Sequence, residues 1–223
     1  MRVVVLISGR GSNLQALLEA HLPVEFACVI SNIAAAQGLE IAAGYGVPTV
    51  VLNHRDYPDR AAFDAALAAE IDTHQPDLVL LAGFMRVLSD AFVRHYARRL
   101  INIHPALLPA FPGLDTHERA LAGGVKLHGC TVHFVTPEVD SGPILAQTAV
   151  PVLPDDTPAT LAARVLHQEH RLYPQAVRWF AQGRVVWRDD GAGQGTVHVR
   201  SLADAGDWAS TWASTSALTS PSD

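Results

Sequence analysis

Short apolar runs rich in β-branched residues alternate with amphipathic stretches along the first hundred residues. The runs predict strands, and the stretches, whose apolar residues recur every three or four positions, predict helices. The predicted strands are residues 3–7, 25–30, 47–52, 78–82 and 100–103, and the predicted helices are residues 13–20, 38–45, 58–74 and 89–96. Strands and helices that alternate with short connections are typical of an α/β fold, with a mostly parallel twisted sheet and flanking helices, Rossmann-like in this half.

The pattern changes after Pro105, where a proline-rich loop replaces the regular alternation. A short helix is predicted over residues 116–122, followed by strands over residues 129–135 and 144–150. Because only eight residues join these two strands, too few for a helical crossover, we expect an antiparallel strand pair in the C-terminal half.

A long amphipathic stretch predicts a helix over residues 157–182, with Asp156 or Thr157 as its cap. Pro174 lies inside it and is expected to kink or break the helix. Two short strands, 185–187 and 197–199, follow as a predicted hairpin. The chain therefore divides into one domain over residues 1–187 and a C-terminal hairpin with a loosely ordered tail over residues 188–223, the tail starting after Ser201.

The amino-acid composition limits the classes of protein to which the chain can belong. The 223 residues are 49% hydrophobic and 17% charged, which is enough apolar material for a sizeable core and argues against disorder. The formal net charge of −6 argues against a nucleic-acid partner, and no apolar run is long enough to span a membrane. Two cysteines, Cys28 and Cys130, make no disulfide framework, which favours a cytoplasmic location. We expect a soluble enzyme that acts on small molecules.

The strand at residues 100–103 leads into the clearest candidate chemistry. Side chains alternate along a strand, so Ile101 and Ile103 share one face while Asn102 and His104 share the other. An amide can donate to a developing oxyanion, and an imidazole can exchange a proton near neutral pH. The structural alternative is an Asn that turns the chain and a His that binds the backbone.

A glycine-rich turn, Ser8–Asn13, follows the first strand. Its amides and the helix start favour an anion. Leu14 occupies the position at which a dinucleotide-binding loop has its third glycine. The residues that end a nucleoside-triphosphate-binding loop are also missing, so a monophosphate is the better candidate ligand. An ordinary turn capped by Ser12 or Asn13 is the alternative.

Three further segments carry candidate residues. Residues 81–86, LAGFMR, end the fourth strand and should face the Asn102–His104 pair across one crevice. Asp140 lies in an ordinary turn sequence, yet a carboxylate there could orient His104 and favour its charged form. Glu169 lies on an apolar helical stripe and needs a partner, either a substrate amine or a structural Arg or His.

Three histidines, His117, His128 and His133, suggest a metal site. None of them has a two-histidine helical spacing, and no cysteine pair supports them, so we expect no metal.

The segments LISGRGSNLQAL, LAGFMR, INIHPALLPAFPG, HGCTVHFV, DSGPILAQ and QEHRLYP resemble, in this order and spacing, the phosphoribosylglycinamide formyltransferase family of purine biosynthesis. The resemblance covers about residues 1–187 and is specific because many separated motifs agree. It implies the formyltransferase fold, with 10-formyltetrahydrofolate as co-substrate and glycinamide ribonucleotide as acceptor. It also implies direct attack of the substrate amine, stabilised by Asn102 and His104, with Asp140 assisting proton transfer.

The resemblance implies binding residues as well. Those for the ribonucleotide are Gly11, Ser12, Asn13, Leu166, His167, Gln168 and Glu169. Those for the folate are Arg60, Met85, Arg86, Val87, Leu88, Asn102, Thr136, Pro137, Glu138, Val139 and Asp140. Ala106 and Arg10 depart from the residues usual in the family, and neither is a catalytic position.

Two other functions remain open at this point. A folate-dependent hydrolase would give the formyl group to water, and a nucleotide-binding module would need only the loop at residues 8–13. The oligomeric state, monomer or homodimer, is left open by the sequence.

Overall fold

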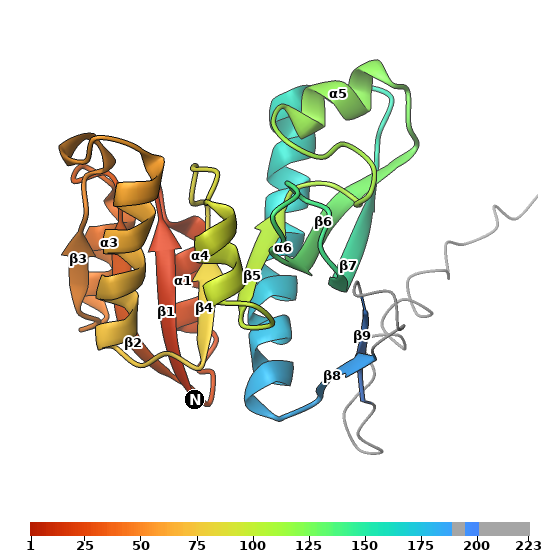
Figure 1. The fold of residues 1–223 in the computed structure, drawn as a ribbon. Helices are drawn as coiled ribbons and strands as arrows, with labels where there is room; N and C mark the ends of the chain where they lie inside the picture. Colours follow the sequence, from red (N-terminus) through yellow and green to blue (C-terminus); the bar gives the residue numbers. More distant parts are fainter. Residues whose placement is uncertain (189–194, 201–223) are drawn as a thin grey trace, which may run out of the picture.

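A seven-stranded sheet forms the centre of the structure, a computed structural model that describes residues 1–188 and 195–200 (Figure 1). Its order is β3-β2-β1-β4-β5-β6-β7. The strands are β1 (Arg2–Ile7), β2 (Glu25–Ser31), β3 (Thr49–Val51), β4 (Leu78–Leu81), β5 (Leu100–His104), β6 (Leu127–Phe134) and β7 (Ile144–Pro151). Strands β1 to β5 are parallel, whereas β6 pairs antiparallel with both β5 and β7. The predicted fold class and the antiparallel pair are confirmed.

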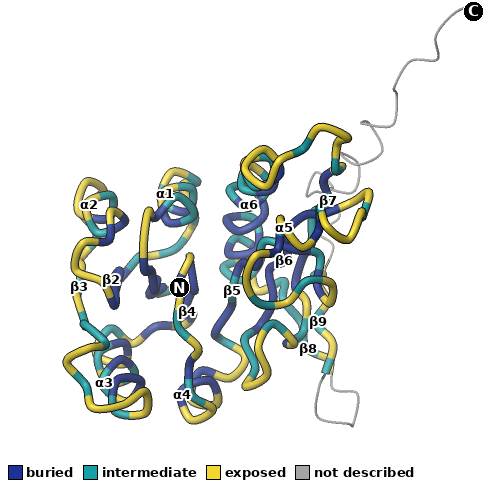
Figure 2. Tube along the Cα trace, turned by 90° about the horizontal axis from the view of Figure 1, so that it is seen from above, coloured by how far each residue is buried: buried dark blue, intermediate teal, exposed yellow. Residues whose placement is uncertain are grey.

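Helices cover both faces of this sheet, as Figure 2 shows from above. They are α1 (Ser12–Glu19), α2 (Gln37–Gly44), α3 (Arg60–Thr73), α4 (Asp90–His95), α5 (Thr116–Ala122) and α6 (Pro158–Ala181), with a 3-10 turn η1 (His54–Asp56). Alternation along β1 creates two cores: Val3 and Val5 pack in the core with α1 and α6, while Val4 and Leu6 pack in the core with α3 and α4.

The structure differs from the predicted elements in detail. Strand β3 is shorter than predicted, β6 begins two residues earlier at Leu127, and η1 was not predicted. The predicted break at Pro174 is wrong, because α6 continues across it. Pro174 and its neighbour Tyr173 are both buried, so tertiary packing stabilises the helix where one backbone N–H is missing.

Thr157 caps α6, as predicted. Its hydroxyl accepts from Thr160 N at 3.2 Å, and the Thr160 hydroxyl accepts from Thr157 N at 2.9 Å. This reciprocal capping box fixes the start of the longest helix. Asp156 instead pairs with Arg164 at 2.7 Å.

The C-terminal hairpin is present as β8 (Val185–Arg188) and β9 (Thr196–Val199), which pair antiparallel. Its Trp187 ring lies 4.4 Å from the ring of Phe134, centroid to centroid, so the hairpin packs on the main core. The predicted loose tail, residues 201–223, lies outside the described residues. No helix in the described part of the chain combines the length and hydropathy needed to cross a membrane.

Candidate active site

The carboxyl end of β5 presents two polar side chains from one face of the sheet. Ile101 and Ile103 belong to the core that contains α6, and Asn102 and His104 project to the other side. The predicted alternation is therefore confirmed. Because β4 and β5 are parallel neighbours, segment 81–86 ends at the same edge of the sheet.

His104 is 5% exposed and has an acceptor at each ring nitrogen. Its Nδ1 lies 3.3 Å from Asp140 Oδ2, and its Nε2 lies 3.0 Å from the backbone oxygen of Phe111. A carboxylate and a carbonyl can only accept hydrogen bonds, so the doubly protonated ring satisfies both contacts.

Asp140 connects two loops at this site. Its Oδ2 also accepts a hydrogen bond from Gly113 N at 2.8 Å, and its backbone has a φ of +52°. Only 11% of its side chain is exposed, so the charge acts on His104 through little water. The structure thus brings Asn102, His104 and Asp140 to one place, although Asp140 is far from the other two in sequence.

His133 is a further member of this cluster, and the sequence reasoning considered it only as a metal ligand. Its Nε2 lies 3.2 Å from Asn102 Nδ2 and 3.6 Å from Asp140 Oδ1. The antiparallel register places His133 directly opposite Asn102. A prediction that β6 pairs with β5 would have placed His133 beside Asn102.

The loop between β1 and α1 approaches the start of α2 closely. Gly11 has a φ of +77°, and a Cβ there would lie 2.5 Å from Gly38 Cα. No side chain caps α1, so the predicted cap by Ser12 or Asn13 is wrong. The first amides of α1 therefore have no side-chain acceptor; an anion there, which the helix dipole would favour, stays a prediction.

Asn13 joins this loop to α6. Its Nδ2 donates to Glu169 Oε2 at 2.7 Å, so the partner of Glu169 is an amide rather than the expected Arg or His. Burial raises the pKa of Glu169, and the hydrogen bond from Asn13 opposes that shift. Leu166 and Gln168 are half-buried on the same helix, and His167 is exposed.

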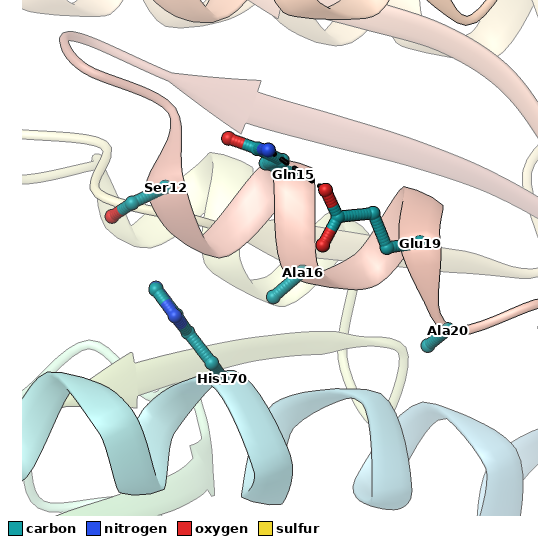
Figure 3. A pocket seen from close by; sticks show the side chains of 6 residues that line it. All are labelled: Ser12, Gln15, Ala16, Glu19, Ala20 and His170. Carbon is teal, nitrogen blue, oxygen red and sulfur yellow. Dashed lines mark hydrogen bonds between the residues drawn. The ribbon is translucent and has the colours of Figure 1, made fainter.

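A pocket of about 380 Å³ lies beside this loop, between α1 and α6 (Figure 3). Its lining residues are Ser12, Gln15, Ala16, Glu19, Ala20 and His170. His170 points from α6 toward α1, and desolvation lowers its pKa, with His167 adding to the effect. The neutral form of His170 is therefore favoured there.

Ser8 holds the segment after β4 in place. Its hydroxyl accepts from Met85 N at 2.9 Å and donates to Asn32 Oδ1 at 2.6 Å. The side chain of Met85 is 68% exposed, whereas the Arg86 guanidinium lies 5.1 Å from the centre of the Phe63 ring. The contacts of Ser8 with Asn32 and Met85 were not predicted, because only the sheet order brings β1, β2 and this segment together.

The remaining predicted folate residues differ in how far they are buried. Val87 is exposed and Leu88 is buried; Thr136 is half-buried, and Pro137, Glu138 and Val139 are exposed beside Asp140. Arg60 is exposed at the first turn of α3. Within residues 1–188 and 195–200, no hydrogen bond or ion pair joins Arg60 to Asn102, His104 or Asp140.

His117 and His128 pack edge to face, 5.3 Å apart, on the α5 side of the cluster. Desolvation lowers the pKa of His128 to about 4. In the described part of the chain, no three His, Cys, Asp or Glu side chains form a metal-binding group. The expectation of a metal-free site stays a prediction.

Comparisons with known proteins show the family to which the chain belongs. A family model described as "Formyl transferase" matches residues 1–177. Phosphoribosylglycinamide formyltransferase of Escherichia coli (strain K12) is 50% identical over 196 residues, which is 86% of this chain and 92% of that protein. The human trifunctional purine biosynthetic protein adenosine-3 is 48% identical over 194 residues, 85% of this chain but 19% of that protein.

A solved structure resembles this chain in both sequence and fold. The crystal structure of glycinamide ribonucleotide transformylase 1 from Symbiobacterium toebii has 49% sequence identity and a TM-score of 0.85, covering 90% of this chain and 94% of that one. Since the family model spans most of the chain and the bacterial relatives are covered almost completely, the chain belongs to the formyl transferase family of enzymes.

Proposed function

We propose that this enzyme transfers a formyl group from 10-formyltetrahydrofolate to the amine of glycinamide ribonucleotide. The observation that carries the proposal is the meeting of Asn102, His104 and Asp140 at the carboxyl end of β5. The names of the similar proteins support formyl transfer to the glycinamide ribonucleotide.

The ribonucleotide is proposed to lie across the β1–α1 loop and α6. The open amides of Gly11, Ser12 and Asn13 suit a phosphate, which a chain of net charge −6 could not attract by bulk charge. Residues 166–169 would hold the glycinamide part, and the hydrogen bond from Asn13 to Glu169 couples the two regions.

The folate is proposed to lie on the other side of the reacting centre. The backbone of segment 85–88 and the turn 136–140 would grip the pterin, with Arg60 reaching the distal part. The Ser8 hydroxyl supports this proposal because it fixes the start of segment 85–88.

The proposed reaction is direct transfer without an enzyme nucleophile. The substrate amine attacks the formyl carbon, forming a tetrahedral intermediate; the bond from that carbon to N10 of the folate then breaks, and the amine's proton passes to N10. Asn102 and charged His104 would stabilise the oxyanion, each donor contributing about 3 kcal/mol. Asp140 would orient His104, favour its charged form and assist the proton transfer through water.

The contact of His104 with Phe111 has a consequence for this mechanism. Because Nε2 already donates to the Phe111 carbonyl, a substrate oxygen must replace that carbonyl before His104 can stabilise it. We therefore propose that the loop at residues 105–113 shifts when both substrates bind.

The test is a spectrophotometric assay for deformylated folate with the purified chain. We expect product only when both substrates are present, and His104→Ala should reduce turnover at least about a hundredfold while remaining folded. Full activity of His104→Ala would refute the assigned mechanism. Deformylation of the folate without the ribonucleotide would instead indicate a folate-dependent hydrolase. Binding of the ribonucleotide without any formyl transfer would indicate a nucleotide-binding module.

A further inference from the structure

The side chain of His133 has no part in the mechanism above, yet it is the nearest neighbour of Asn102 across the sheet. Its Nε2 lies 3.2 Å from Asn102 Nδ2, and the residue is 2% exposed. Strands β5 and β6 hold the pair in register by their own hydrogen bonds. The contact is therefore a fixed feature of the sheet rather than of a loop.

The position of the ring proton on His133 follows from its other nitrogen. Nδ1 lies 3.0 Å from the backbone oxygen of Phe134, which can only accept, so Nδ1 carries a hydrogen. Burial also lowers the pKa of His133, which favours the neutral ring. In a neutral ring with its hydrogen on Nδ1, Nε2 is an acceptor.

An acceptor at Nε2 determines which way the Asn102 amide faces. The amide must present an N–H to His133, and its second N–H then remains available to the reacting centre. Two ionisable groups face the ring from other elements: Asp140, 3.6 Å from Nε2, and His104, whose ring centre is 6.5 Å away. Asp140 draws a proton toward Nε2, whereas the Phe134 carbonyl holds it on Nδ1.

We propose that His133 is a positioning residue that fixes the Asn102 carboxamide with an N–H directed at the reacting carbonyl. The inference rests on the proposed formyl transfer. Without His133 the amide could turn, and its oxygen would then oppose the negative charge that develops in the transition state. The effect should appear in kcat rather than in KM, because the contact serves the transition state.

Three variants separate positioning from packing. His133→Asn keeps a donor near Phe134 but removes the acceptor for Asn102, so kcat should fall about 10- to 100-fold with both KM values within about threefold. His133→Gln places an amide oxygen near the Nε2 position and should restore kcat to within about fivefold of the parent. Val132→Ala is the matched control, since it truncates a buried neighbour on the opposite face of β6.

The control should keep kcat within about threefold of the parent, although its stability falls. His133→Asn with parental kcat, or Val132→Ala as impaired as His133→Asn, would overturn the inference. If the parent chain itself showed no formyl transfer, the proposed function would be overturned as well. The assay of the parent chain comes before any variant is made, so this failure is distinguished from a failure of the inference about His133.

Nitrogen-15 NMR of the histidine rings gives an independent readout. The His133 signal, identified by its absence in His133→Asn, should show the neutral ring with its proton on Nδ1 near pH 7.5. A proton on Nε2, or a doubly protonated ring, would overturn the inference even if the kinetics agreed.

Discussion

Asp140 lies in a backbone conformation that few side chains tolerate. Its φ of +52° falls in the left-handed region, where Asn and Asp are the most frequent residues besides glycine. From there one carboxylate oxygen reaches both Gly113 N and His104 Nδ1. A single residue therefore contacts both the histidine and the backbone of a second loop.

Asp140→Asn separates these two roles. Asparagine tolerates the same backbone and can still accept from Gly113, but it carries no charge to favour protonated His104. We expect kcat for formyl transfer to fall at least about a hundredfold with little change in the unfolding midpoint. Asp90→Asn, at an exposed position on α4, is the control and should be fully active. A variant that retains most of the activity would show that the charge of Asp140 is not required.

Gly11 illustrates a position where space and conformation both exclude a side chain. We expect Gly11→Ala to lower the free energy of unfolding by about 2 kcal/mol, because the methyl group would collide with Gly38 and because a φ of +77° strains a residue that has a Cβ. The KM for the ribonucleotide should rise as the loop shifts. Gly44→Ala has open space and an ordinary φ, so urea unfolding should show unchanged or higher stability. Equal losses in both variants would contradict this account.

At the scale of elements, α6 connects the start of α1 to the centre of the sheet. Glu169 bonds to Asn13 on α1, and one turn later the buried Tyr173 hydroxyl lies 3.1 Å from Leu81 O and 3.2 Å from Ile101 O. These carbonyls are on β4 and β5, at the edge where the candidate site lies. The helix thus links α1 to the sheet edge where the candidate site lies.

Tyr173→Phe tests this role of α6. Removing the hydroxyl takes away one buried hydrogen bond to the backbone carbonyls of β4 and β5, so we expect a loss of about 1 kcal/mol in the free energy of unfolding. Chemical denaturation with circular dichroism would measure it. Trp179→Phe, on the same helix but without this contact to β4 and β5, should affect stability through packing alone and leave KM unchanged. An unaltered stability in Tyr173→Phe would mean that the hydroxyl contributes nothing net.

At the scale of the whole molecule, local patterns predicted the elements better than the contacts between them. The alternation of residues 101–104 was enough to place Asn102 and His104 on one face, because that depends only on neighbours in the chain. The contact of His133 with Asn102 was not predicted, because it depends on which strand β6 joins. The pairing of Asn13 with Glu169 spans 156 residues, and nothing local to either residue specifies it.

Buried histidines also give the whole molecule a dependence on pH. Burial lowers the pKa values of His117, His128 and His133, and that of His128 falls from 6.5 to about 4. A group whose folded pKa is below its unfolded pKa binds more protons when unfolded, so stability falls as the pH drops through that interval. Glu169 acts in the opposite direction, because burial raises its pKa. The histidines outnumber it, so acid should destabilise the fold.

His128→Gln isolates the largest part of this dependence. The ring of His128 is 1% exposed and packs against Phe111 and His117, so protonating it would place a charge between β6 and α5. We expect the parent to lose on the order of 2 kcal/mol through His128 between pH 7 and pH 4.5, and the variant to lose correspondingly less. Urea unfolding at several pH values measures both slopes, and His21→Gln, at an exposed position, should keep the parental slope. If His128→Gln also kept it, His128 would not be the group that takes up the proton.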